Sequence, residues 1–211
     1  MKTPLDKFRP RPDKRLLFFQ GFLKKPQQVG SIIPSSRFME RRLVQTIDFT
    51  NTRTIVELGT GTGGTTKALL RAMPVDAKLL GMELSPEFIK VLDNIHDARL
   101  IPFCGDAEDI ANALSKNNLG APDVVLSGIP FSTMSRKKGL AIVRAIYDVL
   151  APGGRFIAYQ FHNRVRELGT QVFGRPKIDM ELLNIPPMRV YRWEKSGETA
   201  GDPELIRAAG K

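Results

Sequence analysis

Glu57-Leu58-Gly59-Thr60-Gly61-Thr62-Gly63-Gly64 is the stretch of sequence that decides the fold. It follows a short β-rich run, Thr54–Leu58, and leads into a helical pattern over about 64–73. Glycines let the chain turn sharply and bring backbone N–H groups against a ligand at a helix N-terminus. A strand, a glycine-rich turn and a helix in this order predict an α/β domain with a ligand site after its first strand.

The same alternation continues along the chain. Further β-rich runs lie at 79–83, 99–103, 123–127 and 155–161, and helical patterns lie at 86–95, 107–116 and 133–150. An earlier helix is predicted to begin at Ser35 or Ser36, either of which can cap it, and to run through Ile47. Met188–Glu194 is predicted as a last strand with no crossover helix before it, in an antiparallel edge hairpin. Strict alternation elsewhere predicts a Rossmann-like, mostly parallel twisted sheet with helices on both faces.

Size and composition favour one domain. The chain has 211 residues, 42% of them hydrophobic, which is enough for one α/β core. No transmembrane helix or secretory signal is indicated, so we expect the protein in the cytoplasm. One cysteine, Cys104, excludes an intrachain disulfide, and two histidines leave little for a metal site, so no metal is expected. The predicted parts are an N-terminal arm over 1–36, a domain over 37–194 and a polar tail over 195–211.

The N-terminal arm is strongly basic. Residues 1–42 carry eleven lysine or arginine residues against three acidic ones, whereas the whole chain has a net charge of +10. Within the arm, a helix-length segment ends at Pro26 and places large apolar residues between basic ends. These features predict contact with an anionic membrane surface, with nucleic acid phosphate or a solvated or domain-packed helix as alternatives. The predicted membrane residues are Lys14, Arg15, Leu16, Phe19, Phe22, Leu23, Lys24 and Lys25.

Acidic residues around the glycine-rich turn indicate the ligand. Glu57 suits the positive charge of S-adenosylmethionine better than a pyrophosphate. Glu83 ends the second strand, where a carboxylate can accept the ribose hydroxyls, and Asp106 follows the third, where it could bind the adenine amino group. With the Leu150-Ala151-Pro152-Gly153-Gly154 turn, this set resembles class I methyltransferases. The predicted cofactor residues are Glu57, Gly59, Thr60, Gly61, Thr62, Gly63, Glu83, Leu84, Asp106, Ala107, Ser127 and Gly128.

The methyl acceptor should lie beside Ser127-Gly128-Ile129-Pro130-Phe131, after the fourth strand. Enzymes that methylate base amines carry Asn or Asp, then Pro and an aromatic residue that stacks the flipped base. The last three residues resemble ribosomal RNA adenine dimethyltransferases, but Gly128 stands where the amide would be. This departure counts against RNA, which we keep as the alternative substrate.

Most of the chain resembles bacterial phospholipid N-methyltransferases, which methylate phosphatidylethanolamine. The resemblance rests on the basic arm, the stretch 29–36, the glycine-rich turn, the 127–131 stretch and the stretch 184–192. It implies a lipid amine substrate and peripheral attachment to the inner face of the cell membrane, with an ornithine-type lipid or a small amine as alternatives. Transfer to nitrogen requires a neutral amine, so His162 and Tyr159 are the acid/base or orienting candidates. The predicted substrate residues are Ile129, Pro130, Phe131, Ser35 and Arg37, and candidates for a lipid phosphate include Arg136, Lys138, Arg164 and Arg166.

Overall fold

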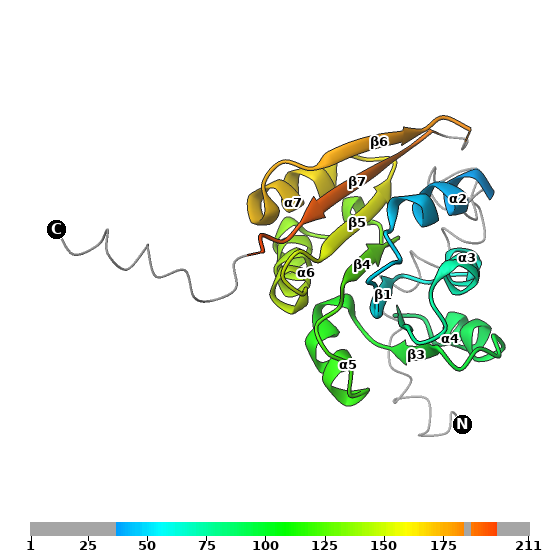
Figure 1. Ribbon diagram of the computed structural model, residues 1–211. Helices are drawn as coiled ribbons and strands as arrows, with labels where there is room; N and C mark the ends of the chain where they lie inside the picture. Colours follow the sequence, from blue (N-terminus) through cyan, green and yellow to red (C-terminus); the bar gives the residue numbers. More distant parts are fainter. Residues whose placement is uncertain (1–36, 184–186, 198–211) are drawn as a thin grey trace, which may run out of the picture. The chain divides into compact units, whose positions relative to one another are not determined.

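The computed structural model describes residues 37–183 and 187–197 (Figure 1). The chain divides into two compact units, Met1–Ile33 and Pro34–Lys211. The first unit lies outside the described residues, and so do the predicted membrane helix over 14–25 and the predicted helix caps Ser35 and Ser36. The described residues all belong to the second unit.

A seven-stranded sheet forms its centre, in the order β3-β2-β1-β4-β5-β7-β6 (Figure 1). The first five strands in sequence are parallel, while β7 is antiparallel to both of its neighbours, β5 and β6. It follows that β6 runs in the same direction as β5. The strands are β1 (Thr54–Leu58), β2 (Lys78–Glu83), β3 (Leu100–Cys104), β4 (Val124–Ser127), β5 (Arg155–Gln160), β6 (Lys177–Glu181) and β7 (Met188–Glu194).

Among the residues that the structure describes, three helices cover each face of the sheet, and the side chains of the central strands alternate between the two cores. Ile55 of β1 packs with α2 (Arg37–Thr46), α3 (Gly64–Ala72) and α4 (Pro86–Asp93). Its neighbour Val56 packs on the other face with α5 (Ile110–Lys116), α6 (Arg136–Val149) and α7 (Arg164–Phe173). Because both faces are buried, these strands consist mostly of apolar residues. The predicted Rossmann-like fold with an antiparallel edge is confirmed.

Two elements near the C-terminus were missed. The last strand, β7, forms an antiparallel hairpin with β6, as predicted, and among the described residues no helix lies between these two strands. The sequence did not predict α7 or β6, which both lie between β5 and β7. Gly169 weakens the helical signal of α7, yet it is required, since a Cβ there would collide with the ring of Trp193. The exposed side chains of β6 hide its strand character. The predicted helix over 107–116 also begins as a 3₁₀ turn, Ala107–Asp109, before α5.

Lys195, predicted to start the loose tail, is still fixed to the domain. Its backbone N–H donates to the carbonyl of Gly154 at 2.8 Å, and its own carbonyl accepts from the N–H of Gly153 at 3.0 Å. Its ammonium group also donates to the carbonyl of Leu150 at 2.8 Å. The first tail residue therefore extends the attachment of β7.

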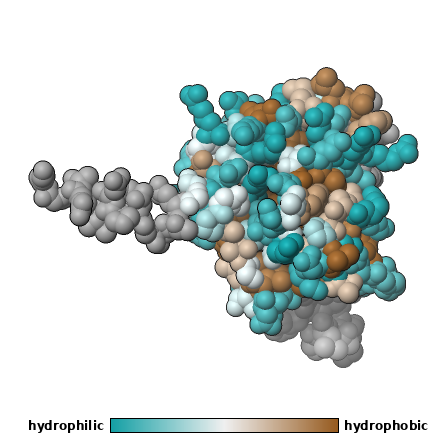
Figure 2. All heavy atoms as spheres, viewed as in Figure 1, coloured by the Kyte–Doolittle hydropathy of each residue, from teal (hydrophilic) through white to brown (hydrophobic). Residues whose placement is uncertain are grey.

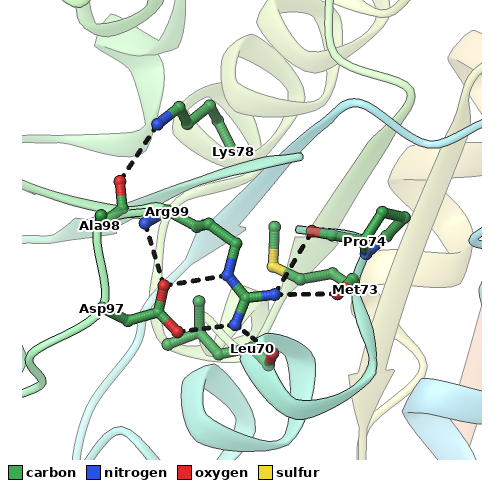
Figure 3. A network of polar contacts seen from close by, with 7 residues as sticks. All are labelled: Leu70, Met73, Pro74, Lys78, Asp97, Ala98 and Arg99. Atoms are coloured by element: carbon green, nitrogen blue, oxygen red, sulfur yellow. Dashed lines mark hydrogen bonds and ion pairs between the residues drawn. The ribbon is translucent and has the colours of Figure 1, made fainter. Parts of the chain in front are cut away.

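Arg99 fastens the start of β3 to the end of α3 (Figure 3). Its guanidinium donates to the carbonyls of Leu70 at 2.6 Å and Met73 at 2.9 Å, which the helix leaves without internal partners. Asp97 holds the same guanidinium at 2.7 Å and 2.9 Å. The hydrogen bonds from the Arg99 side chain, followed by one from the Arg99 backbone N–H, lower the pKa of Asp97 to about 2. The network lies at the amino edge of the sheet, away from the glycine-rich turn, and its role is structural.

Candidate active site

The glycine-rich turn ties together the ends of three strands. Gly59, Gly61 and Gly63 have φ values of +79°, +51° and +76°, in the left-handed region that favours glycine. The N–H of Gly59 donates to the carbonyl of Met82 at 2.8 Å, and the N–H of Gly128 donates to that of Leu58 at 2.9 Å. A Cβ on Gly59 would approach the Ile129 side chain to 2.8 Å. The cofactor turn and the acceptor loop are therefore in direct contact.

Glu57 is a buried carboxyl group with one unused acceptor. Its side chain accepts a hydrogen bond from the hydroxyl of Thr66 at 2.7 Å, and burial raises its pKa to about 8. Within the described part of the chain, Glu57 Oε1 and the hydroxyl of Thr60 are buried without a hydrogen-bond partner. Buried polar atoms without partners are unusual, and here they fit the ammonium group of a bound S-adenosylmethionine.

Glu83 shapes the turn that it faces. It is 3% exposed, and its carboxylate accepts from the N–H groups of Gly61 at 3.0 Å, Leu84 at 2.8 Å and Ser85 at 3.0 Å. Since the two oxygens of a carboxylate offer about four acceptor positions, one remains for a ribose hydroxyl. The prediction was that Glu83 accepts both ribose hydroxyls, and the one remaining position would serve one of them, so the ribose role stays a prediction; Glu83 also holds the glycine-rich turn.

Asp106 and Ala107 follow β3. The Asp106 side chain caps the 3₁₀ turn by accepting from the N–H of Glu108 at 3.0 Å, and it pairs with the ammonium of Lys138 at 2.7 Å. Lys138 also contacts the Glu108 carboxylate at 2.6 Å. Because two carboxylates already hold Lys138, it is a poor candidate for a lipid phosphate. The adenine role of Asp106 stays a prediction.

Tyr159 occupies the space beside Gly128. A Cβ on Gly128 would lie 2.5 Å from the Tyr159 hydroxyl oxygen and 3.0 Å from its Cζ. The side-chain amide of Gln160 donates to the carbonyl of Ile129 and so fixes the acceptor loop. A side chain at position 128, such as the amide expected in an adenine methyltransferase, would therefore require the Tyr159 side chain to move.

The remaining predicted acceptor residues lie in different environments. Phe131 was predicted to contact the substrate, but it is fully buried in the core beside Gly139, so this assignment is corrected. Ile129 and Pro130 are half-buried, and Arg37 is exposed at the start of α2. His162 is exposed after β5, with its ring edge-on to Phe161 at 5.1 Å. Of the predicted cofactor residues, Ser127 is buried and Thr62 is exposed.

A cleft of about 460 Å³ opens between the N-terminal ends of α6 and α7. Two of the predicted anion-binding residues, Arg136 and Arg166, line it together with Asn163, Glu167 and Thr170. Both helices begin at the carboxyl edge of the sheet, just after the 3₁₀ turn Phe131–Thr133 and after β5. The lining residues include two arginines and one acidic residue, Glu167, so they carry a surplus of positive charge. The Glu167 carboxylate is paired with Arg164, which does not line the cleft, at an N–O distance of 3.4 Å.

Sequence reasoning missed three side chains that support the site. Thr66 holds Glu57, Gln160 holds the acceptor loop, and Glu40 of α2 reaches the start of α3, where a Cβ on Gly64 would lie 2.7 Å from its carboxylate. Burial raises the pKa of Glu40. The sequence contains no signal for Glu40, because its position depends on how α2 packs.

Neither a metal cluster nor a membrane span occurs in the described part of the chain. No group of three or more His, Cys, Asp or Glu side chains that could hold a metal ion is found within residues 37–183 and 187–197. Across the same ranges, none of the helices is long and apolar enough to span a bilayer.

Comparisons with known proteins agree with this geometry. A family described as "Methyltransferase domain" matches residues 55–154. An ornithine lipid N-methyltransferase from Singulisphaera acidiphila is 29% identical over 185 residues, which cover 83% of this chain and 93% of the relative.

Solved structures share the fold. The N-methyltransferase NodS from Bradyrhizobium japonicum with S-adenosyl-L-homocysteine has a TM-score of 0.62 at 11% identity, over 84% of this chain and 97% of its own. A methyltransferase from Pyrococcus furiosus has a TM-score of 0.56 at 15% identity, over 87% and 98%. The protein thus carries a class I S-adenosylmethionine-dependent methyltransferase domain.

Proposed function

We propose that this protein N-methylates the amine headgroup of a membrane lipid at the cytoplasmic face of the cell membrane. Phosphatidylethanolamine is the acceptor that the resemblance in the sequence favours, and an ornithine lipid is the acceptor named for the relative at 29% identity. Both carry an amine and an anionic group, a phosphate or a carboxylate, in one headgroup.

The observation that carries this proposal is the pairing of Gly128 with Tyr159. A planar adenine amine needs an oriented acceptor such as an amide, and the Tyr159 hydroxyl takes up the space that such a side chain would need. A single hydroxyl can hold a tetrahedral alkyl amine without reading a base edge. This arrangement supports a lipid amine over RNA.

Different side chains of the protein would bind the cofactor, orient the acceptor amine and accept its proton. S-adenosylmethionine supplies an electrophilic methyl group when bound. Glu57 and Thr60 would hold its ammonium end and Glu83 its ribose. Tyr159 orients the acceptor nitrogen, whose lone pair must face the methyl group in line and whose extra proton must first leave. His162, exposed beside the same edge, is the candidate to accept that proton.

The cleft between α6 and α7 is suited to the anionic group of the headgroup. Arginine binds phosphate and carboxylate through a fork of N–H groups, and Arg136 and Arg166 reach the cleft from two different helices. Holding the anion there would fix the amine near the 127–131 loop. The N-terminal arm with its basic residues is proposed as a membrane anchor.

Transfer of labelled methyl groups tests the function. The purified protein receives radiolabelled S-adenosylmethionine with anionic vesicles that contain phosphatidylethanolamine, with vesicles that contain an ornithine lipid, or with bulk ribosomal RNA. We expect label in the solvent-extracted lipid of at least one vesicle sample, and the two samples decide between the headgroups. Label in RNA alone would overturn the proposal.

A further inference from the structure

Exposed apolar side chains gather at one edge of the domain. Within the described residues, eight large hydrophobic side chains are exposed, and four of them directly follow the carboxyl end of a strand. These four are Leu84 after β2, Phe161 after β5, and Leu182 and Leu183 after β6. Val75, between α3 and β2, lies at the opposite edge, and Ile178 is the second residue of β6, toward that edge. The carboxyl edge is also the edge of the glycine-rich turn and the acceptor loop.

The end of β6 is the most exposed part of this edge. Leu182 and Leu183 are 67% and 64% exposed, and Met180 is 46% exposed. Pairing of Glu181 with Met188 places both leucines beyond the last rung of the β6–β7 ladder. In Figure 2, hydrophobic residues gather on the upper right of the molecule, the side where Figure 1 shows the end of this hairpin. Side chains of this size left in water indicate a contact with another apolar phase.

Helix α2 supplies positive charge and one more apolar side chain beside the hairpin. Arg42 of α2 pairs with Glu181 at 3.1 Å, which fixes the helix next to the end of β6. The N-terminal half of α2 exposes Phe38, at 51%, between the exposed Arg37 and Arg41. Apolar side chains with arginines beside them are typical of a surface that rests in the interface of an anionic bilayer.

We infer that this edge of the catalytic domain is itself a membrane-docking surface, formed by Phe38, Met180, Leu182 and Leu183 with Arg37 and Arg41, and that its partner is an anionic lipid bilayer. The inference rests on the proposed lipid substrate. Docking by this edge turns the acceptor loop toward the headgroups, so that an amine reaches the Gly128 and Tyr159 pair without the lipid leaving the membrane. It adds a second contact to the one proposed for the arm over 14–25.

Vesicle partitioning of the full chain tests the surface. The variant Leu182→Asp/Leu183→Asp is compared with Val75→Asp, which places one charge on the exposed apolar residue of the opposite edge, 90% exposed. We expect the double variant to lose at least about tenfold in partitioning onto vesicles with anionic lipid, because two leucines no longer leave water. The loss should persist in high salt. Val75→Asp should partition like the wild-type protein.

A second variant guards against misfolding. Leu183→Trp keeps an apolar side chain that favours the interface, so its partitioning should be retained and its fluorescence should shift to the blue on vesicles and be quenched by brominated lipids. The matched Val75→Trp should show neither change. Calorimetric binding of S-adenosylmethionine should be the same in all variants.

The outcomes separate the docking surface from the function. Wild-type partitioning by the double variant, or a Leu183→Trp emission that vesicles leave unchanged, would overturn the docking surface even if lipid is methylated. A dimer in light scattering that the double variant dissolves, with vesicle binding unchanged, would assign the surface to a second copy of the chain. Hairpin-dependent binding without label in lipid would instead defeat the proposed function and leave the docking surface standing.

Discussion

The hydroxyl oxygen of Tyr159 lies 2.5 Å from the point where a Cβ on Gly128 would stand. The two positions are therefore coupled: a side chain on one excludes the present side chain on the other. Gly128 directly follows β4 and Tyr159 is near the end of the neighbouring β5, so their closeness follows from the register that pairs Ser127 with Ala158. The Tyr159 hydroxyl, on β5, thus lies beside the position on the loop after β4 where adenine methyltransferases carry an amide.

Removing that hydroxyl tests its role directly. Tyr159→Phe should lower the rate of methyl transfer about 10²-fold, the size typical of a lost acid/base or orienting group, with little change in calorimetric affinity for S-adenosylmethionine. Gly128→Ala should lower both the melting temperature and the rate, because its Cβ meets the hydroxyl. In the double variant the melting temperature should partly recover while the rate stays low. An unchanged rate of methyl transfer in Tyr159→Phe would show that the hydroxyl has no role in the reaction and that the tyrosine is structural.

Glu57 should couple cofactor binding to proton release. Burial raises its pKa to about 8, so the free protein holds this carboxyl largely protonated at pH 7. A cationic ligand favours the ionised form, so affinity for S-adenosylmethionine should rise between pH 6 and 7.5, by up to about tenfold per unit. Titration calorimetry in two buffers of different ionisation enthalpy measures the released proton. Glu57→Gln should lose the pH dependence, whereas Glu194→Gln, at an exposed carboxylate, should keep it.

A rising pH, which should strengthen cofactor binding through Glu57, should weaken the stability of the folded protein through the same group. Since the folded-state pKa of Glu57 is raised above the unfolded value of 4.5, the folded protein is favoured most below that pH. This contribution is lost as the pH rises from 4.5 through about 8. Glu57→Gln should therefore gain melting temperature relative to the wild-type protein at pH 8 and less at pH 5. An equal difference at both pH values would contradict a buried, protonated carboxyl group.

The arginines of the cleft should govern acceptor binding. Arg166→Ala is expected to raise KM for the lipid about tenfold, with a smaller effect on kcat, since a charged hydrogen bond is lost in the ground state and in the transition state alike. Arg136→Ala should behave similarly. Arg144→Ala, an exposed arginine farther along α6, is the matched control. Equal KM values for all three variants would show that the cleft does not hold the headgroup anion.

Arg99 should contribute to folding but not to catalysis. Arg99→Ala leaves the last carbonyls of α3 and the Asp97 carboxylate without their partner, so the free energy of unfolding should fall by about 2 kcal/mol. The pKa of Asp97 is lowered to about 2 in the folded protein, below its value of 3.8 in the unfolded chain. The stabilisation is therefore present above the unfolded pKa and is lost as the pH falls from about 4 toward 2. Denaturant unfolding at pH 7 and pH 3 measures both effects. Arg53→Ala should have little effect, because Arg53 and Asp76 are both more than half exposed.

Local sequence was sufficient for the parallel part of the fold and for the glycine-rich turn after β1. Strands buried on both faces are rich in apolar residues, and the glycines follow β1 because glycine accepts the positive φ values found there without steric cost. The acidic residues could be placed at the carboxyl ends of the strands for the same reason, and their roles toward the cofactor stay predictions. Local sequence failed where an element depends on a distant partner, as with Gly169 against Trp193 in α7 and with the half-exposed β6.

The sequence by itself determined the fold class, the position of the cofactor turn and the absence of an amide at position 128, because each is written in short-range patterns of residue type. Only the tertiary structure decided that Tyr159 occupies the space beside Gly128, that Phe131 belongs to the core, that two helices bring Arg136 and Arg166 to one cleft and that the leucines after β6 share an edge with the acceptor loop. These relationships join residues far apart in the chain. Sheet register and helix packing create them, and no local pattern encodes either.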